Sequence, residues 1–352
     1  MRILVIALSG IGDALMFTPA LIKLKENFPN VEIDALVMFK GAEDIYKRLA
    51  QVSAVHYYDF INSNPVAALR YLLRFRKKYN MTINVYPANR REYNLMSFII
   101  GARKRAAVSY LRKNLLNFGF LNNVTIKEND NLHNVEENVK LCEKLINSPI
   151  DEIPDLQLNL TEEELLFGEK FLLEKNVSEK DIVIGFHPGC ATFKNHIKRR
   201  WEPEKFIGLG KNLIKDFNAK ILLFGGEDEE KLKSEIIEGI NSSSAFSVRT
   251  KTLLQSAAVM KRCNVFVTND SALMHIAAAL KLKVIGIIGP TNKDYIYPWH
   301  TNHKLVSLNL DCSPCFYYSP KPLTCTRKDM KFKCIKNLST NMVYKVVNEF
   351  LN

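Results

Sequence analysis

The sequence predicts an α/β fold in which parallel sheets are covered by helices on both faces. Short β-rich runs alternate with helical patterns in both halves of the 352-residue chain, and this alternation is typical of βαβ units. The chain is 47% hydrophobic, so it can bury a large core, and its length is that of two ordinary domains. We therefore expect two α/β domains that face a central cleft, with ligands gathered at the carboxyl ends of the strands.

The first half opens with a β-rich run that leads directly into the turn Ser-Gly-Ile-Gly-Asp at residues 9–13. A stretch with apolar side chains at helical spacing follows, and Thr18 and Pro19 suit its first turn. The expected strands of this half are residues 2–8, 31–38 and 81–87, and the expected helix is residues 18–28.

The alternation restarts after a bridging helix near residues 156–180. Thr161 and Glu164 have the spacing of a capping box at its start. The expected strands beyond it are residues 181–189, 219–226, 264–270 and 283–290, and the expected helices are residues 202–217, 227–240, 252–263 and 271–281.

The formal net charge of +12 indicates acidic partners such as nucleic acid, a nucleotide phosphate or anionic lipid. Solubility and a Lys-, Asn- and Ile-rich composition are the alternative explanation. No apolar stretch approaches the roughly 18 residues of a membrane span. Gly10, Gly12 and Asp13 interrupt the apolar N-terminus, and no small-residue cleavage site follows, so a signal peptide is not indicated. We expect a cytoplasmic protein with peripheral contact at a membrane.

The turn after the first expected strand is a poor dinucleotide fingerprint. Gly10 and Gly12 fit the pattern G-x-G-x-x-G, but Leu15 stands where the third glycine belongs. Two glycines let the backbone pass close to a ligand without a Cβ, so the turn would present the carboxylate of Asp13. The alternative is that Asp13 only caps the helix that follows.

Three further clusters follow expected strands. A basic loop of Lys194, Lys198, Arg199 and Arg200 precedes the helix at residue 202, and cations beside helix-start N–H groups suit a diphosphate. The carboxylates at residues 227–230 open a helix, where they are favourable electrostatically, and contact with a ribose or base is the functional alternative.

The third cluster, Asp270, Ser271 and His275, lies at a strand-to-helix junction. A Ser/His/Asp hydrolase is not favoured, because Ser271 lacks a nucleophile-elbow setting. A structural histidine is the alternative for His275.

Four of the seven cysteines, Cys312, Cys315, Cys325 and Cys334, cluster near the C-terminus. An odd total without a signal peptide disfavours a secreted disulfide framework. Four thiolates could form a closed zinc site, and reduced buried thiols or a redox-sensitive pair are the alternative.

Four stretches, SGIGDALMFTPAL, HPG…KRRWEPEKF, FGGEDE and TNDSALMHIAAAL…GIIGPT, resemble in order the signatures of glycosyltransferase family 9. These are the ADP-heptose:lipopolysaccharide heptosyltransferases and their relatives. The resemblance runs from residue 1 to about residue 335. It implies a GT-B architecture of two Rossmann-like domains. The implied division is an acceptor-binding domain over 1–155, a linker helix over 156–180, a nucleotide-sugar domain with the cysteine cluster over 181–335, and a last helix over 336–352 that returns to the first domain.

The resemblance also implies an inverting, metal-independent transfer in which Asp13 is the general base. The residues it assigns to the nucleotide sugar are Lys198, Arg199, Arg200, Glu227, Glu229, Asp270, Ser271, Ala272 and His275. Those it assigns to the acceptor side are Gly10, Gly12, Arg90 and Arg91. A basic acceptor-side surface would add Arg103, Lys104, Arg105, Arg112 and Lys113, and an ordinary solvated helix pair is the alternative.

The predicted function is transfer of heptose from ADP-heptose to the anionic inner core of lipopolysaccharide. The enzyme would work in the cytoplasm, at the inner face of the inner membrane, with no cofactor. Two alternatives stay open. One is a GT-B glycosyltransferase with another nucleotide sugar. The other is a non-catalytic basic protein that binds a nucleotide sugar or nucleic acid, although no nucleic-acid-binding motif is found and we expect no nucleic-acid partner.

Overall fold

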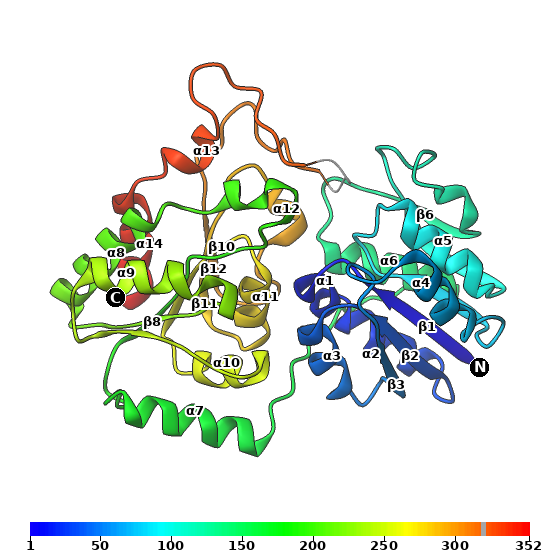
Figure 1. Cartoon of the computed structure of the whole chain (residues 1–352), viewed down its shortest axis with the longest axis horizontal. Coiled ribbons are helices and arrows are strands. Elements are labelled where there is room, and N and C mark those ends of the chain that lie inside the picture. The colour runs from blue at the N-terminus through cyan, green and yellow to red at the C-terminus, as the bar shows by residue number, and fades with distance from the viewer. Residues whose placement is uncertain (318–321) are drawn as a thin grey trace. The chain divides into compact units, whose positions relative to one another are not determined.

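The structure, a computed structural model, describes residues 1–317 and 322–352. It divides into two compact units, and the chain passes from the first to the second at residues 159–160. The described part of each unit contains one parallel six-stranded sheet with helices on both faces (Figure 1). The predicted α/β class with parallel sheets is confirmed.

The first unit is built on β1, whose sequence Arg-Ile-Leu-Val-Ile-Ala is buried beyond its first residue. A strand covered on both faces needs such a continuous apolar run. The order of its sheet is β3-β2-β1-β4-β5-β6. Its strands are β1 (Arg2–Ala7), β2 (Glu32–Val37), β3 (Ala54–Tyr57), β4 (Met81–Asn84), β5 (Lys104–Ser109) and β6 (Val124–Lys127). Its helices are α1 (Ile11–Met16), α2 (Thr18–Asn27), α3 (Lys40–Lys47), α4 (Pro65–Leu73), α5 (Arg91–Ile100), the 3-10 turn η1 (Gly119–Leu121) and α6 (Asn134–Ile146).

The second unit repeats the same strand order. Its sheet reads β12-β11-β10-β7-β8-β9, so the direction of winding reverses between β7 and β10, as it does between β1 and β4. Its strands are β7 (Val183–His187), β8 (Lys220–Leu223), β9 (Ala245–Ser247), β10 (Val265–Asn269), β11 (Lys283–Ile287) and β12 (His303–Val306). Its helices are α7 (Glu162–Glu174), η2 (Phe193–Arg199), α8 (Pro203–Phe217), η3 (Glu227–Glu229), α9 (Glu230–Ile240), α10 (Leu253–Met260), α11 (Ala272–Ala279), α12 (Lys293–Ile296), α13 (Lys333–Lys336) and α14 (Thr340–Leu351).

The bridging helix α7 and the last helix α14 both pack against the second unit. The expected capping box of α7 is present, since Thr161 and Glu164 bond reciprocally. The helix then packs on α10. The resemblance implied that the last helix returns to the first unit, but α14 packs on α8 and on β10, β11 and β12. The reason is its apolar face, because Val343, Val347 and Phe350 complete the core of the second unit. No helix within residues 1–317 and 322–352 is long and apolar enough to cross a membrane.

Replacement of Val347 by Ala tests this placement of α14. Because Val347 is fully buried in the core of the second unit, we expect Val347→Ala to lower the free energy of unfolding by about 2 kcal/mol. The control is Leu173→Ala on α7, where the side chain is exposed and a change within about 0.5 kcal/mol is expected. Urea denaturation of the two variants would measure both values. Equal stabilities would contradict the packing of α14 described here.

Candidate functional site

The polar residues of the second unit gather where its central strands end. His187 is the last residue of β7 and pairs with Thr268 of the neighbouring strand β10. Asp270 follows β10, Glu229 lies beyond β8, and Thr291 lies beyond β11. In a parallel sheet these carboxyl ends share one edge, and the point where winding reverses is the usual place for a ligand.

Asp270 is paired with Arg199 at this edge. Arg199 donates to Oδ2 of Asp270 at 2.5 Å, and the hydroxyl of Thr291 donates to the same oxygen at 2.6 Å. The guanidinium of Arg199 also lies 5.4 Å from the ring centroid of Phe316 and 3.2 Å from Nδ1 of His196. Because these contacts come from several sides, Arg199 is held in one orientation.

Glu229 forms a second buried centre with Arg200 and His187. Arg200 donates to Oε1 of Glu229 at 2.9 Å, and Nε2 of His187 lies 3.1 Å from Oε2. Burial alone would raise the pKa of Glu229, but the His187 hydrogen bond and the Arg200 charge hold it below its ordinary value. The other ring nitrogen of His187 lies 2.8 Å from the hydroxyl of Ser271. The network therefore links the end of β8 to the start of α11.

Two glycines make room for the Glu229 carboxylate. A Cβ at Gly189 would lie 1.7 Å from Oε1 of Glu229, and one at Gly225 would lie 2.6 Å from Oε2. Gly225 also has φ +151, a conformation that L side chains rarely adopt. These contacts explain why glycines occur in the turns that follow β7 and β8.

His275 lies one turn into α11 and is 4% exposed. Burial lowers its pKa to about 4, although the charge of Asp270 acts to raise it. Among the described residues, no hydrogen-bond partner is present for Nδ1 of His275, Nε of Arg199 or Nε of Arg200. Unpaired buried polar atoms are costly, and Arg199 and His275 both lie near Asp270, so this edge of the sheet is a candidate place for a polar ligand.

The other residues predicted for this site differ in burial. Lys198 and Glu227 are exposed, while Ser271 and Ala272 are half-buried at the start of α11. Of the two acidic candidates, Glu229 is therefore the one within the buried network. Sequence reasoning gave no role to His187, His196 or Thr291. The position of His187 at the end of a strand was the one signal that could have found it.

In the first unit, Asp13 lies in the first turn of α1 and Gly10 is the N-cap residue. Asp13 is thus not the N-cap that the structural alternative required. A Cβ at Gly10 would lie 2.9 Å from Oδ2 of Asp13, so the carboxylate closely approaches the turn backbone.

Three tyrosines lie near the Asp13 carboxylate. Burial raises the pKa of Tyr46, Tyr93 and Tyr110, and the charge of Asp13 adds to each effect. The hydroxyl of Tyr93 donates to the carbonyl of Leu8 at 2.9 Å, which ties α5 to the end of β1. The tyrosines were not predicted, because they come from α3, α5 and the loop after β5.

Arg90 and Arg91 have different environments at the start of α5. The guanidinium of Arg90 lies 5.8 Å from the ring centroid of Tyr93, beside the Asp13 turn. Arg91 is exposed and pairs with Glu92 at 3.2 Å. The structure therefore brings Arg90, but not Arg91, towards the turn.

The four clustered cysteines are free thiols. Burial, followed by the neighbouring Cys315, Cys325 and Cys312, raises the pKa of Cys334 to about 11. The part of the chain that the structure describes holds no group of three or more Cys, His, Asp or Glu side chains arranged to bind a metal ion. The four thiols nevertheless lie near one another, since the charges of Cys315, Cys325 and Cys312 act on Cys334.

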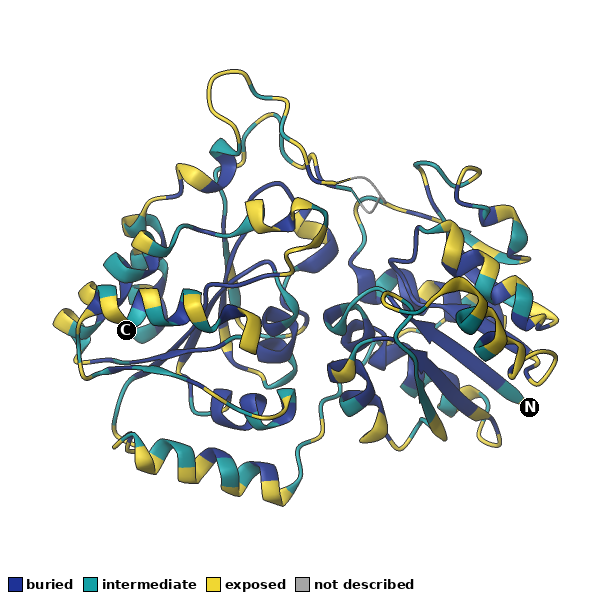
Figure 2. Cartoon of the chain, viewed as in Figure 1, coloured by how far each residue is buried: buried dark blue, intermediate teal, exposed yellow. Residues whose placement is uncertain are grey.

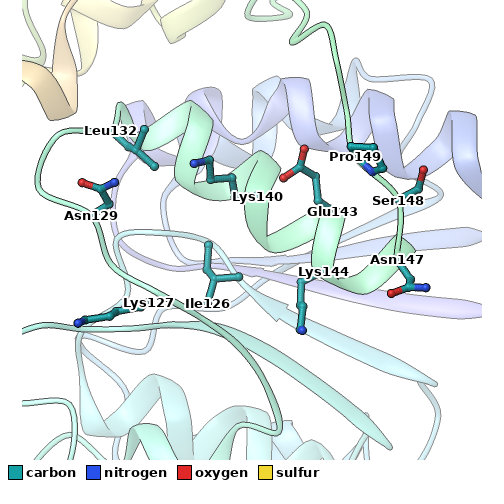
Figure 3. Close-up of a pocket in the computed structure, with 10 residues that line it drawn as sticks. All are labelled: Ile126, Lys127, Asn129, Leu132, Lys140, Glu143, Lys144, Asn147, Ser148 and Pro149. Atoms are coloured by element: carbon teal, nitrogen blue, oxygen red, sulfur yellow. The ribbon is translucent and has the colours of Figure 1, made fainter.

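A groove of about 520 Å³ lies elsewhere in the first unit, between the β6 strand and helix α6 (Figure 3). Three exposed lysines, Lys127, Lys140 and Lys144, line it together with Glu143. None of the residues predicted for donor or acceptor lines this groove.

The burial of His275 predicts a pH dependence of stability. Its pKa is about 4 in the folded protein and near the ordinary 6.5 in the unfolded chain, so the unfolded state takes up a proton first. The contribution of His275 to the free energy of unfolding is therefore fully present above pH 6.5. It is lost as the pH falls towards 4, and the loss is at most about 3 kcal/mol. We expect His275→Gln to reduce this loss in urea denaturation measured from pH 7 to pH 4.5.

His196 provides the comparison for that experiment. Burial, followed by the charge of Arg199, lowers its pKa to about 4 as well. His196→Gln should therefore remove a similar share of the acid sensitivity, and the double variant should remove both. If the free energy of unfolding of all three variants fell with pH as steeply as that of the wild type, the two histidines would not be the source of the acid sensitivity.

Comparisons with known proteins identify the family. The glycosyltransferase family 9 (heptosyltransferase) model matches residues 75–323. A lipooligosaccharide heptosyltransferase 2 of Campylobacter jejuni subsp. jejuni serotype O:6 is 26% identical, over 99% of both chains.

Two solved heptosyltransferase structures share the fold. Escherichia coli ADP-heptose lps heptosyltransferase II has a TM-score of 0.74 at 21% identity, over 100% of this chain and 98% of its own. E. coli heptosyltransferase WaaC with ADP has a TM-score of 0.67 at 20% identity, over 99% of this chain and 100% of its own. The predicted GT-B architecture is confirmed. Since the family model covers well over half of its length, the chain belongs to glycosyltransferase family 9 and is a glycosyltransferase.

Proposed function

We propose that this glycosyltransferase moves heptose from ADP-heptose to the inner core of lipopolysaccharide, with inversion at the anomeric carbon and without a catalytic metal. The observation that carries the donor assignment is the group of unpaired buried nitrogens on Arg199, Arg200 and His275. Such N–H groups and cations suit an anionic diphosphate. The similarity to a lipooligosaccharide heptosyltransferase 2 and to an ADP-heptose lps heptosyltransferase II supports the choice of nucleotide and acceptor.

The donor diphosphate is proposed to lie at the start of α11. Ser271 is its N-cap residue and makes no side-chain cap bond, so the first N–H groups of this helix are available to phosphate oxygens. Arg199 and Arg200 would supply positive charge from the adjoining loop. Asp270 and Glu229 hold these two arginines in place through the ion pairs described above. The exposed Lys198 and Glu227 would act only at the rim, near the nucleoside or the sugar.

Asp13 is proposed as the general base. It would take the proton of the acceptor hydroxyl as that oxygen forms its bond to the anomeric carbon. The bond from the anomeric carbon to the diphosphate oxygen breaks at the same time, and ADP leaves with the electron pair. Arginine and helix N–H groups stabilise the charge that develops on the diphosphate, which is the role a metal has in other transferases.

The acceptor is proposed to bind beside the Asp13 turn. Gly10 and Gly12 would allow close approach of a sugar to the backbone, and Arg90 would meet its anionic groups. The exposed Arg91 would act only farther from the turn. We place the reaction in the cytoplasm, at the inner face of the inner membrane, because an acceptor of this kind is a membrane lipid.

The cysteine cluster is proposed to serve structure rather than chemistry. The burial of Cys334 supports a structural role. A second candidate function keeps the fold and changes the sugar, since the arginine and helix contacts proposed here recognise the diphosphate and not the glycosyl group.

Replacement of Arg199 tests the donor site. We expect Arg199→Gln to weaken ADP binding by about tenfold or more, the usual effect of losing one charge-assisted hydrogen bond. Glutamine can still donate to Asp270, which limits damage to the fold. Isothermal titration calorimetry with ADP would measure the affinity.

The matched control is Lys198→Gln, which removes the same charge from the exposed neighbouring position. We expect a change within about threefold, since a surface charge contributes little. If the two variants bound ADP with equal affinity, Arg199 would not be part of the donor site.

Replacement of Asp13 tests the mechanism. Asp13→Asn keeps the size and hydrogen-bonding capacity of the side chain but cannot accept the proton. We expect turnover to fall by about 100-fold or more, with unchanged ADP affinity and melting temperature. The assay is ADP release and product formation from ADP-heptose and a lipopolysaccharide core acceptor. Turnover within a few-fold of wild type would overturn the role of Asp13 as the base.

A further inference from the structure

The positive charge of the first unit is concentrated in one segment. Residues 61–120 contain twelve lysines and arginines and a single acidic residue, Glu92, which gives a net charge of +11. The rest of the first unit, residues 1–60 and 121–159, carries −6, while residues 160–352 carry +7. Within the first unit this concentration indicates a local anionic partner.

The same segment carries most of the exposed large apolar side chains. In the described part of the chain, ten of sixteen such residues lie between positions 61 and 120. They are Ile61, Val66, Leu69, Leu73, Leu95, Phe98, Leu111, Leu115, Leu116 and Phe120. Single exposed apolar residues are ordinary, but a group of this size marks an interaction site.

These side chains belong to neighbouring elements. Val66, Leu69 and Leu73 are spaced by three and four residues along α4, so they form one stripe on its exposed side. Helix α4 packs against α5, and α5 packs against η1. Figure 2 shows exposed positions along α4 and α5. We call the exposed residues of α4, α5 and the loop 111–120 the α4–α5 surface.

The loop part of this surface rests on a buried asparagine network. Nδ2 of Asn94 donates to the carbonyl of Asn117 at 2.7 Å, and Nδ2 of Asn122 donates to Oδ1 of Asn94 at 2.7 Å. These bonds tie the loop to α5 from beneath. Leu115 and Leu116, 73% and 71% exposed, therefore stand on a fixed base.

We propose that the α4–α5 surface docks onto an anionic lipid bilayer. The apolar side chains would enter the interface between headgroups and acyl chains, while the lysines and arginines around them pair with lipid phosphates. A second copy of this chain is a poorer partner, because it would bring together two segments that each carry a net charge of +11. Nucleic acid would satisfy the cations but leave the leucines and phenylalanines in water.

This inference rests on the proposed function in one respect, that the acceptor is a membrane lipid. Docking to vesicles can be measured without any heptose transfer. The experiment is co-sedimentation of the full chain with phosphatidylglycerol-containing vesicles and with phosphatidylcholine vesicles. We expect binding to the anionic vesicles that weakens as salt is added. Absence of binding to them at low salt would overturn the proposal.

Two variants separate the apolar and the charged contributions. Replacing Leu115, Leu116 and Phe120 with Ser should weaken vesicle binding by about tenfold or more. Replacing Arg70, Arg74 and Arg76, which lie on α4 and directly after it, with Gln should weaken it by about 100-fold, since each basic residue near an anionic surface contributes about fivefold. All six positions are exposed, so the melting temperature should stay unchanged.

The matched control removes three lysines from the groove in the same unit. Lys127, Lys140 and Lys144 replaced with Gln lose the same charge from a groove that shares no lining residue with the α4–α5 surface (Figure 3). We expect this variant to bind vesicles within about threefold of wild type. An equal loss in the control would overturn the proposal, because net charge alone would then explain binding.

Activity and oligomeric state distinguish the remaining outcomes. On a short water-soluble acceptor, all three variants should turn over like wild type. A chain that binds vesicles but transfers no heptose would refute the proposed function and leave the docking surface intact. A dimer in sedimentation velocity that the Leu115, Leu116 and Phe120 replacements dissociate, without vesicle binding, would show that the partner is a second copy.

Discussion

The pairing of two buried carboxylates with two neighbouring arginines is the interaction on which the candidate donor site depends. Asp270 and Glu229 are each about one-tenth exposed, and a carboxylate at that depth is strongly destabilising unless it is paired. Arg199 and Arg200 satisfy them and are themselves immobilised. Each arginine nevertheless keeps an unpaired Nε. A ligand that binds there meets donors that are already oriented, which lowers the entropic cost of binding.

The repeated strand order places the residues of interest of both units at the point where the winding of the sheet reverses. In the first unit the first strand, β1, leads to Asp13 among buried tyrosines. In the second unit the neighbouring central strand, β10, leads to Asp270 with Arg199. One architecture thus presents a carboxylate able to accept a proton in one unit and a cationic cluster in the other.

The sequence alone predicted the central strands and several residues of the candidate site. Continuous apolar runs predicted β1, β2, β7 and β10, because these strands are buried on both faces. The outer strands β3, β6, β9 and β12 were missed, since they are short, partly exposed and lack a clear pattern, and β5 was missed although its centre is buried. His187, Thr291 and the tyrosines near Asp13 were also missed. Their contacts join separate strands and helices, and no local spacing in the sequence encodes such contacts.

The distribution of charge differs between the two units. The second unit, residues 160–352, carries a net charge of +7, so a general positive charge adds to the attraction that Arg199, Arg200 and the start of α11 offer an anionic nucleotide. In the first unit the net charge of +11 on residues 61–120 is offset by −6 elsewhere, and it lies in the segment that also carries exposed leucines and phenylalanines. The single number for the whole chain therefore hides two different things: a basic second unit that suits the donor, and one strongly basic segment in a first unit that is acidic elsewhere.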